Sequence, residues 1–298
     1  MSLTALYDVA APAKLNLFLH ITGRRDDGYH LLQSVFMLID WCDTLHVELR
    51  SDGQLSREDL TTELPPDDLV LRAARALQAH AAPGQGAHIG VAKQVPAQAG
   101  MGGGSSDAAT CLLALNRLWG LNLPLSRLAE IGVKLGADVP FFLGGRNAWV
   151  EGIGEKIRPV DIPSARFVVA KPPQGLDTKL IFSAPDLQRA TPVAIISGFA
   201  ADSEQLEAPN PESSAFKVFD FGHNDLQPVA QRLCPAVSDA IEWLGAQGLK
   251  ARMTGSGSSV FAKMPQGPQK AELAEAPTGW QVRQCNNLAV HPLWGWAT

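Results

Sequence analysis

Hydrophobic and polar residues alternate near the start of the chain. Leucine or isoleucine occupies every second position of residues 14–21, KLNLFLHI. A period of two predicts a β-strand that buries one face and leaves the other accessible. The second face carries Lys14, Asn16 and His20. The alternation therefore predicts an apolar core on one side of this strand and polar side chains available to a ligand on the other.

Other segments repeat their apolar residues every three or four positions, which predicts amphipathic helices. Helices are expected at 67–80, 105–120, 126–136 (with Ser126 as N-cap), 225–247 and 268–275. Strands are expected at 31–41 and 44–50, joined by a short turn that contains Asp, and at 87–96 and 280–284. A strand and loop are expected at 166–173, a strand or hairpin at 141–152, a strand, turn and strand at 249–264, and an irregular insertion at 183–215. This mixed order, without an internal repeat, predicts an α+β protein.

The length of 298 residues predicts two domains, at roughly 150 residues for each. Proline and glycine punctuate residues 152–163, which makes this segment the candidate boundary. We therefore expect an N-terminal domain over 1–161 and a C-terminal domain over 162–298.

The composition is that of an ordinary globular protein, with 46% hydrophobic and 18% charged residues. The net charge of −5 disfavours nucleic acid and acidic membrane surfaces as partners. No apolar run approaches the roughly 20 residues of a membrane helix, and no secretory signal is expected at the N-terminus. Four scattered cysteines are expected to be reduced thiols in a cytoplasmic protein. The oligomeric state stays open.

A glycine-rich segment, AGMGGGSSDAA, occupies residues 99–109 and opens a predicted helix. Backbone N–H groups in such a loop, together with the positive end of the helix dipole, favour phosphate oxygens. The segment lacks the lysine of GxxxxGK[ST], and its surroundings do not fit the dinucleotide motif GxGxxG. A flexible turn with an N-capping serine is the alternative.

Four other features are weak signals individually. Lys14 and Asn16 share a strand face, although such a face is often only solvated. Asp138 stands before Pro140, where a carboxylate is held at a cleft rim or simply forms a turn. The sequence GYH at 28–30 offers an aromatic ring and a hydrogen-bonding group for a flat heterocycle, or core packing. The second glycine and serine turn, TGSGSS, begins at residue 254.

Together the motifs strongly resemble the superfamily of galactokinase, homoserine kinase, mevalonate kinase and phosphomevalonate kinase. The resemblance rests on PAKLNLFLHITGRRDDGYHLL, PAQAGMGGGSSDAA, LGADVPFFL, NDLQPV and MTGSGSSVF, which span about residues 12 to 261. PAKLNL and DGYH point to members that phosphorylate the 2-hydroxyl of a cytidine diphosphate-linked methylerythritol, in non-mevalonate isoprenoid biosynthesis. The resemblance implies a two-domain kinase with ATP and its small-molecule substrate in the cleft between the domains.

The resemblance also assigns roles to residues. Asp138 is implied as the base and Lys14 as the cation that orients it. The implied ATP-binding residues are Lys93, Pro96, Ala97, Gln98, Ala99, Gly100, Met101, Gly102, Gly103, Gly104, Ser105 and Ser106. The implied substrate-binding residues are Asn16, Tyr29, His30, Phe182, Gly255, Ser256 and Gly257, with the rings of Tyr29 and Phe182 on the two faces of cytosine and His30 at its edge.

Mg²⁺ is expected to accompany ATP, with Ser106 and Asp107 as candidate ligands. Two positions differ from the pattern of the family: Met101 stands where leucine is usual, and Asp68 stands where asparagine is usual. The second difference leaves the adenine and ribose contacts unassigned. Two other functions remain possible, namely a kinase of the same fold for homoserine, mevalonate or a sugar, and a non-catalytic nucleotide-binding module.

Overall fold

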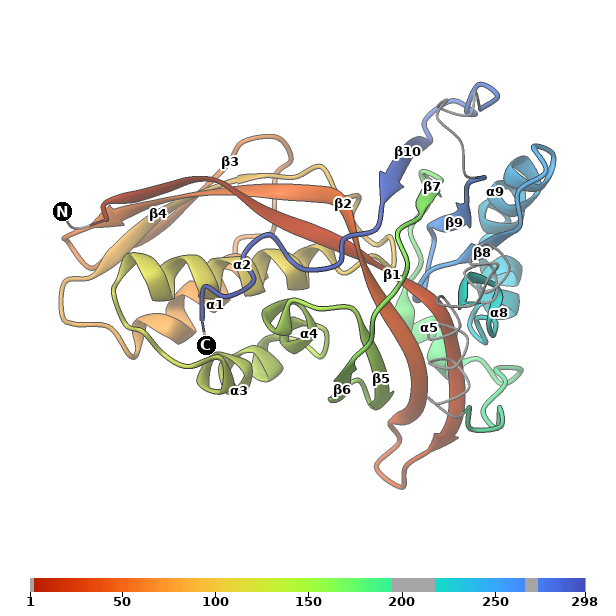
Figure 1. Ribbon diagram of the computed structural model, residues 1–298, viewed down its shortest axis with the longest axis horizontal. Helices are drawn as coiled ribbons and strands as arrows, with labels where there is room; N and C mark the ends of the chain where they lie inside the picture. Colours follow the sequence, from red (N-terminus) through yellow and green to blue (C-terminus); the bar gives the residue numbers. More distant parts are fainter. Residues whose placement is uncertain (1–2, 195–217, 266–272, 298) are drawn as a thin grey trace, which may run out of the picture.

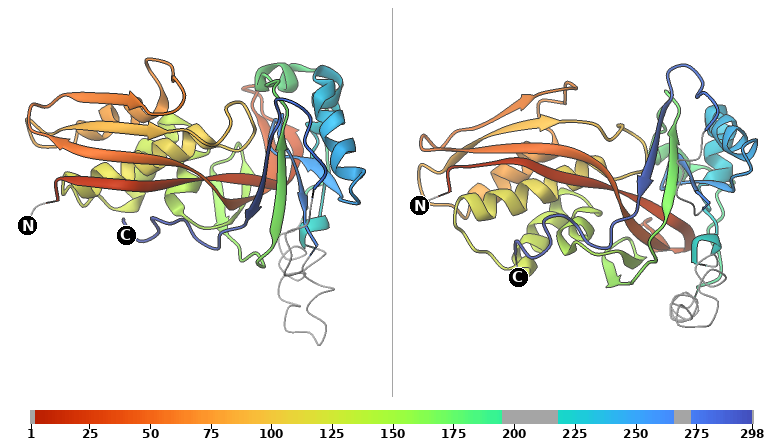
Figure 2. Two further views of the ribbon diagram at one scale, coloured as in Figure 1. Left: turned by 90° about the horizontal axis from the view of Figure 1, so that it is seen from above. Right: turned by 45° about the horizontal axis from the view of Figure 1, so that its top comes forward.

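The chain folds into two β-sheets with helices packed against them, so the predicted α+β class is confirmed (Figures 1 and 2). This computed structural model describes residues 3–194, 218–265 and 273–297. Most of the predicted helix at 268–275 and most of the predicted insertion at 183–215 lie outside the described residues, and residues 273–275, which are described, are not helical. Within the described residues, every helix is too short or too polar to span a bilayer.

The first sheet has the strand order β3-β4-β2-β5-β6, with β1 paired to β2. All of these pairings are antiparallel except that of β3 with β4. The strands are β1 (Ala5–Arg24), β2 (His30–Arg50), β3 (Leu55–Asp59), β4 (Gly86–Ala92), β5 (Ala148–Gly152) and β6 (Lys156–Pro159). The strands predicted at 31–41 and 44–50 are thus one continuous strand, β2, and the turn predicted between them was wrong.

Four helices lie on one side of this sheet (Figure 1). They are α1 (Leu69–Gln78), α2 (Gly103–Leu118), α3 (Leu125–Leu135) and α4 (Val139–Gly144). The carboxylate of Asp68 caps α1 by accepting hydrogen bonds from two backbone N–H groups. Asp68 also forms an ion pair with Arg57 at 2.6 Å, so the residue that differs from the family pattern has a structural role here.

Strand β1 differs from its predicted environment, because every residue from Ala11 to Ile21 is buried. Apolar side chains of β1 share a hydrophobic cluster with Phe167 and Phe261 of the second sheet. The same strand pairs with β2 and packs against α2. The polar side chains Lys14, Asn16 and His20 are therefore buried as well, and their face of the strand is not a solvated edge.

The second sheet has the order β10-β7-β9-β8 and is antiparallel throughout. Its strands are β7 (Arg166–Lys171), β8 (Ala251–Met253), β9 (Val260–Lys263) and β10 (Gln281–Asn286), and its helices are α5 (Thr178–Ser183), α8 (Gln227–Leu233) and α9 (Pro235–Gly245). These elements confirm the strands predicted within 166–173 and at 280–284. They also confirm the strand, turn and strand predicted at 249–264 and the helices predicted at 225–247.

The change from one sheet to the other falls between Pro159 and Arg166. The chain after Asn286 returns to the first sheet, where the Leu288 N–H donates to the Leu38 carbonyl at 2.9 Å. Leu293 is buried in the core of the first sheet. The last residues of the predicted 162–298 domain thus pack on the predicted 1–161 domain, and the C-terminus lies beside the helices of the first sheet (Figure 1).

Two other local predictions were wrong. Helix α3 begins at Leu125 with Pro124 in the N-cap position, so Ser126 is not the cap. Residues 141–144 belong to α4, and only residues 148–152 of the predicted strand form β5. A short apolar run such as FFLG does not distinguish a helix from a strand, and packing against α2 and α3 decides it here.

Asn147 anchors the returning C-terminal segment, and its removal should destabilise the fold. Its side-chain oxygen accepts from the Leu38 N–H at 2.8 Å and its amide donates to the Leu288 carbonyl at 2.9 Å, in a site that is 2% exposed. Asn147→Ala is expected to lower the free energy of unfolding by about 1–3 kcal/mol, because it leaves a buried N–H without an acceptor. Urea unfolding measures the loss.

The matched control is Asn286→Ala, which removes an exposed hydrogen bond to Asp40 at the end of β10. It should cost about 0.5 kcal/mol or less, as most surface substitutions do. Equal losses in the two variants would contradict the anchoring role of Asn147.

Candidate active site

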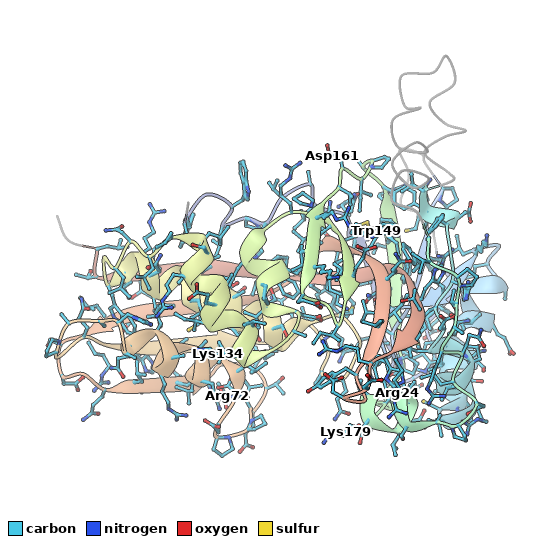
Figure 3. All side chains as sticks on the ribbon, turned by 90° about the horizontal axis from the view of Figure 1, so that it is seen from below. Arg24, Arg72, Lys134, Trp149, Asp161 and Lys179 are labelled. Atoms are coloured by element: carbon cyan, nitrogen blue, oxygen red, sulfur yellow. The ribbon has the colours of Figure 1, made fainter. Side chains whose placement is uncertain are left out.

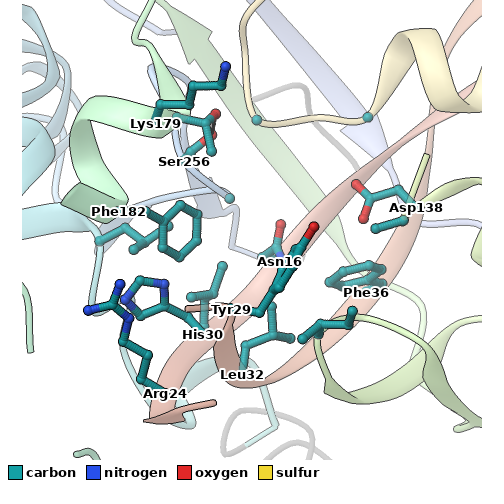
Figure 4. Close-up of a pocket in the computed structure, with 18 of the residues that line it drawn as sticks. Asn16, Arg24, Tyr29, His30, Leu32, Phe36, Asp138, Lys179, Phe182 and Ser256 are labelled. Carbon is teal, nitrogen blue, oxygen red and sulfur yellow. Dashed lines mark hydrogen bonds between the residues drawn. The ribbon is translucent and has the colours of Figure 1, made fainter. Parts of the chain in front are cut away.

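A cavity of about 760 Å³ lies where β1, the glycine-rich loop, the turn after β8 and α5 meet (Figure 4). Phe182 and His30 lie at one end of this cavity, and Asp138 and Phe36 lie at the other. The residues that line this cavity include Lys14, Asn16, Arg24, Tyr29, His30, Phe36, Gly100, Gly102, Asp138, Lys179, Phe182, Gly255 and Ser256. The cavity thus brings together residues from the whole length of the chain.

Lys14 places a buried ammonium at the floor of this cavity. The residue is 4% exposed, and its Nζ lies 2.5 Å from the Asn16 side-chain oxygen, 4.7 Å from the centre of the Phe36 ring and 3.8 Å from Asp138 Oδ2. Burial lowers the pKa of Lys14, and Asp138 opposes part of that effect. The ammonium is therefore held by one amide oxygen, one aromatic face and one carboxylate.

Asp138 is the more accessible member of this pair. Its side chain is 31% exposed, and it stands directly before α4 without capping that helix. The carboxylate is thus free of backbone hydrogen bonds from the first turn of α4 and can face both Lys14 and a ligand. A carboxylate beside a cation, open to a cleft, is suited to accept a proton from a bound hydroxyl group.

Asn16 is oriented by groups from two other elements. Its side-chain N–H₂ donates to the Ser34 hydroxyl at 2.8 Å, and its backbone N–H donates to the Thr254 hydroxyl at 2.9 Å. These bonds direct the side-chain oxygen toward Lys14. Thr254 precedes the second glycine turn, so β1 is connected to that turn directly.

The glycine-rich loop enters α2 without any side-chain cap. Gly100 and Gly102 both have φ of 71°, which is the left-handed region where glycine is favoured. The first turn of α2 therefore presents backbone N–H donors and the positive end of the helix dipole. An anion at this point would satisfy donors that the protein itself leaves without a cap.

The loop also touches the second glycine turn very closely. A Cβ on Gly100 would lie 2.2 Å from the Thr254 carbonyl oxygen, and one on Gly255 would lie 2.7 Å from the Gly100 carbonyl oxygen. The Ser258 N–H donates to the Gln98 carbonyl at 3.3 Å. Only glycine permits this contact between the two halves of the molecule.

The other predicted ATP-binding residues surround this contact. Gly100 and Gly102 line the cavity, whereas the side chains of Ala99 and Met101 are buried in the core between the sheets. Ser106 is fully buried in the first turn of α2. Pro96, Ala97, Gln98, Gly103, Gly104 and Ser105 are at least partly exposed. Their contacts with a nucleotide remain predictions.

Lys93 is not part of the cavity lining. Its ammonium lies between two buried carboxylates, those of Asp43 and Asp107, and the Asp107 oxygen is 2.5 Å away. The pKa of Asp107 is raised to about 7, because burial and the nearby Asp43 raise it more than Lys93 lowers it. Asp43 also accepts from the Val95 N–H at 2.8 Å. The charge of Lys93 thus serves a buried network that holds the chain just before the loop.

The opposite end of the cavity carries the predicted base-binding residues. The rings of His30 and Phe182 are 5.0 Å apart at an interplanar angle of 35°. Tyr29 is 61% exposed and lines the same cavity. Asn16, Gly255 and Ser256 line it as well, whereas Gly257 is not among the lining residues. The structure therefore brings nearly all of the predicted substrate residues to one cavity.

Two cations of the cavity were missed by the sequence analysis. Arg24 and Lys179 both line it, and Figure 3 shows them at the same edge of the molecule. Arg24 stands opposite His30 in the antiparallel register of β1 and β2. Lys179 stands three residues before Phe182 in α5, a spacing that places both on one helix face. The closeness of Arg24 to His30 and of Lys179 to Phe182 in the sequence could have indicated that these two cations lie at the cavity.

A divalent metal has few possible protein ligands here. No cluster of three His, Cys, Asp or Glu side chains that could hold a metal occurs in the described part of the chain. Buried oxygen atoms without a hydrogen-bond partner do occur in the first turn of α2, namely Ser106 Oγ and Asp107 Oδ1. This arrangement fits Mg²⁺ that takes most of its ligands from phosphate groups and water.

Comparisons with known families agree with this geometry. Residues 68–146 match the model of the GHMP kinases N terminal domain, and residues 204–277 match that of the GHMP kinases C terminal. A 4-diphosphocytidyl-2-C-methyl-D-erythritol kinase from Variovorax paradoxus is 96% identical over 99% of both chains. A protein of the same name from Albidiferax ferrireducens is 65% identical over 98% of this chain and 96% of its own.

Solved structures show the same architecture. A crystal structure of 4-(cytidine 5'-diphospho)-2C-methyl-D-erythritol kinase has a TM-score of 0.73 and 32% identity, covering 93% of this chain and 98% of its own. A mevalonate kinase from L. major, in complex with R-mevalonate, has a TM-score of 0.67 over 97% of this chain and 98% of its own. Its identity of 15% supports a likeness of fold alone.

Removal of Lys93 should destabilise the protein in a pH-dependent way. Lys93→Met leaves the carboxylates of Asp43 and Asp107 buried without a cation, which should cost about 3–5 kcal/mol at pH 8. The pKa of Asp107 is already raised, and without Lys93 it rises further, so its protonated form favours the folded state. The loss should therefore be small at pH 5 and should grow as the pH rises through about 7.

Urea unfolding at pH 5 and pH 8 measures this difference. Lys134→Met, at an exposed position in the last turn of α3, is the matched control and should change stability by about 0.5 kcal/mol or less at both pH values. A Lys93→Met variant that is equally stable at pH 5 and pH 8 would contradict the buried network.

Proposed function

Because the chain belongs to the GHMP kinases, and is 96% identical to one of their 4-diphosphocytidyl-2-C-methyl-D-erythritol kinases, we propose that it phosphorylates that same alcohol with ATP. The group transferred is the γ-phosphoryl group, and the acceptor is the 2-hydroxyl of the methylerythritol. The observation that carries the proposal is a single cavity with Lys14 and Asp138 at one end, His30 and Phe182 at the other, and Tyr29 in the lining between them. A substrate with a reactive alcohol and a distant flat base requires both ends.

The proton of the acceptor hydroxyl passes to the Asp138 carboxylate. The hydroxyl oxygen then forms a bond to the γ-phosphorus as the bond between that phosphorus and the bridging oxygen breaks, and ADP carries away the electron pair. Lys14, 3.8 Å from Asp138, stabilises the negative charge that develops on the acceptor oxygen. Phosphoryl transfer has a loose transition state, so alignment and charge neutralisation supply most of the acceleration.

The glycine-rich loop is the proposed site for the phosphates of ATP. The uncapped first turn of α2 offers backbone donors, and the positive φ of Gly100 and Gly102 allows the chain to approach a phosphate closely. Mg²⁺ bound to ATP would neutralise phosphate charge, with Ser106 and Asp107 as its possible protein ligands. The lysine that is missing from the loop is replaced, in this proposal, by Lys14 from β1.

The cytidine end of the substrate is proposed to bind among Tyr29, His30 and Phe182. Aromatic faces bind flat bases by stacking, and a histidine at the edge supplies a hydrogen bond. Arg24 and Lys179 also line the cavity, on the side of His30 and Phe182, and in this proposal they neutralise the substrate diphosphate. Homoserine, mevalonate and sugars have no base to fill this end, which favours the cytidine substrate over those alternatives. We also propose a cytoplasmic location, where ATP and small biosynthetic alcohols are available.

Asp138→Asn should abolish most turnover. The amide cannot accept the hydroxyl proton, so kcat is expected to fall about 10²- to 10⁴-fold, while KM for ATP changes little. A coupled ADP-release assay with the cytidine substrate measures both values. Asp161→Asn is the control, because Asp161 is 93% exposed and forms a surface ion pair with Arg146. Turnover of Asp138→Asn equal to that of the control would remove Asp138 from the role of base.

The pH dependence should reveal the charge of Lys14. The pKa of Lys14 is lowered by burial, so the ammonium loses its proton at a lower pH than an ordinary lysine. Activity is therefore expected to be retained below that pKa and to fall as the pH rises through it. Lys14→Arg keeps its charge at high pH, so the variant should be slower but should lack this alkaline decline. A kcat/KM profile between pH 6 and pH 10 distinguishes the two, and the same decline in both proteins would contradict the assignment.

A further inference from the structure

Arg189 joins the two sides of the base-binding end of the cavity. Its Nε donates to His30 Nε2 at 3.1 Å. One terminal nitrogen donates to the carbonyl oxygens of Phe182 at 3.2 Å and Ala184 at 2.6 Å, and the other donates to that of Leu187 at 3.1 Å. Arg189 thus connects the first residue of β2 to the end of α5 and the loop that follows it.

The bond to His30 determines where the imidazole carries its proton. A guanidinium is always protonated and has only donors, so His30 Nε2 must accept with its lone pair. A neutral imidazole has one donor and one acceptor nitrogen, so the proton lies on Nδ1. Since Nε2 is occupied by Arg189, Nδ1 is the ring nitrogen that remains for a ligand.

The charges around His30 favour this neutral ring. Burial, the positive charge of Arg189 and that of Arg24 all lower the pKa of His30. The only carboxylate that lines the described cavity near this hairpin is Asp27, which pairs with Arg25 at 2.7 Å. Phe182, which packs against the imidazole ring, carries no charge.

Arg189 forms no salt bridge in the described part of the chain, and the carboxylate that feels its charge, Asp186, is paired with Arg232. The four hydrogen bonds of Arg189 within the described part of the chain all go to neutral acceptors, three carbonyl groups and one imidazole. An arginine whose only function was to hold the loop would need no contact with the imidazole. The bond to His30 therefore requires an explanation beyond loop stability.

We propose that Arg189 is a positioning residue for base selection, which fixes His30 as the Nδ1–H tautomer and holds Phe182 beside it. This proposal rests on the proposed function. A fixed donor at Nδ1 fits an acceptor on the base edge, such as the ring N3 of cytosine. Uracil carries a hydrogen on that nitrogen, so a fixed donor there opposes a uridine substrate.

The tautomer can be measured without any substrate. In the protein labelled with ¹⁵N-histidine, long-range ¹H–¹⁵N correlation spectra distinguish a protonated ring nitrogen from one that bears a lone pair. We expect His30, assigned by its absence in His30→Gln, to show Nδ1–H and an Nε2 lone pair at pH 8. In Arg189→Met the Nε2–H form should appear, and the pKa of His30 should rise because a positive charge has been removed.

Kinetics test the consequence for the substrate. Arg189→Met should raise KM for the cytidine substrate about tenfold or more, as loss of a charged hydrogen-bond donor does, with KM for ATP unchanged. The ratio of kcat/KM for the cytidine substrate to that for its uridine analogue should fall, because both tautomers become available. Arg189→Lys keeps a charged donor and should recover part of that ratio.

Arg232→Met is the matched control. Arg232 forms an exposed ion pair with Asp186 in the same loop, and it is not among the residues that line the cavity. It should change neither the His30 tautomer nor the cytidine-to-uridine ratio.

An Nε2–H tautomer in the wild-type protein, or an unchanged tautomer in Arg189→Met, would overturn the proposal. So would equal losses on both substrates in that variant, since these indicate a loosened loop alone. If no cytidine substrate is turned over at all, the proposed function fails, but the spectra still decide whether Arg189 fixes the tautomer.

Discussion

The buried ammonium of Lys14 constrains the structure more than any other group in the cavity. Removing an ammonium from water costs several kcal/mol, so nearby groups must stabilise its charge. Those groups are the Asn16 oxygen, the Phe36 ring and the Asp138 carboxylate, which belong to β1, β2 and the start of α4. The need to surround one charge thus fixes the relative positions of three elements. The same positions create a cation and a proton acceptor side by side.

The two sheets meet at a contact that only backbone atoms can make. Gly100 of the glycine-rich loop and Gly255 of the second turn approach so closely that a Cβ on either would overlap a carbonyl oxygen of the other side. Asn16 and Thr254 add a hydrogen bond between β1 and the same turn. The half that carries the glycine-rich loop and the half that carries the second turn are therefore joined at the cavity itself.

The sequence predicted local elements well and burial poorly. The period of two at residues 14–21 correctly predicted a strand, but it could not show that the polar face is buried as well, with Phe36 and Asp138 enclosing Lys14. The partners of Lys93 lie 50 and 14 residues away in the chain, so the ion pairs that neutralise it depend on tertiary structure. The sequence RRDDGYH places Arg24 close to His30, whereas Arg189 comes from a segment that resembles no motif. Proximity of that kind appears only in the folded chain.

The charge of the cavity differs from that of the whole protein, and this difference decides which ligands it can accept. The chain carries a net charge of −5. Within the cavity, Lys14, Arg24 and Lys179 oppose Asp27 and Asp138, so the described lining has one positive charge in excess. Two further cations lie outside this lining: the ammonium of Lys93 is neutralised by buried carboxylates, and the guanidinium of Arg189 donates a hydrogen bond to His30. In the proposed complex, these local cations attract the phosphates of the ligand although the whole chain is negative. The base is selected separately, by the hydrogen bond that His30 Nδ1–H would donate to it.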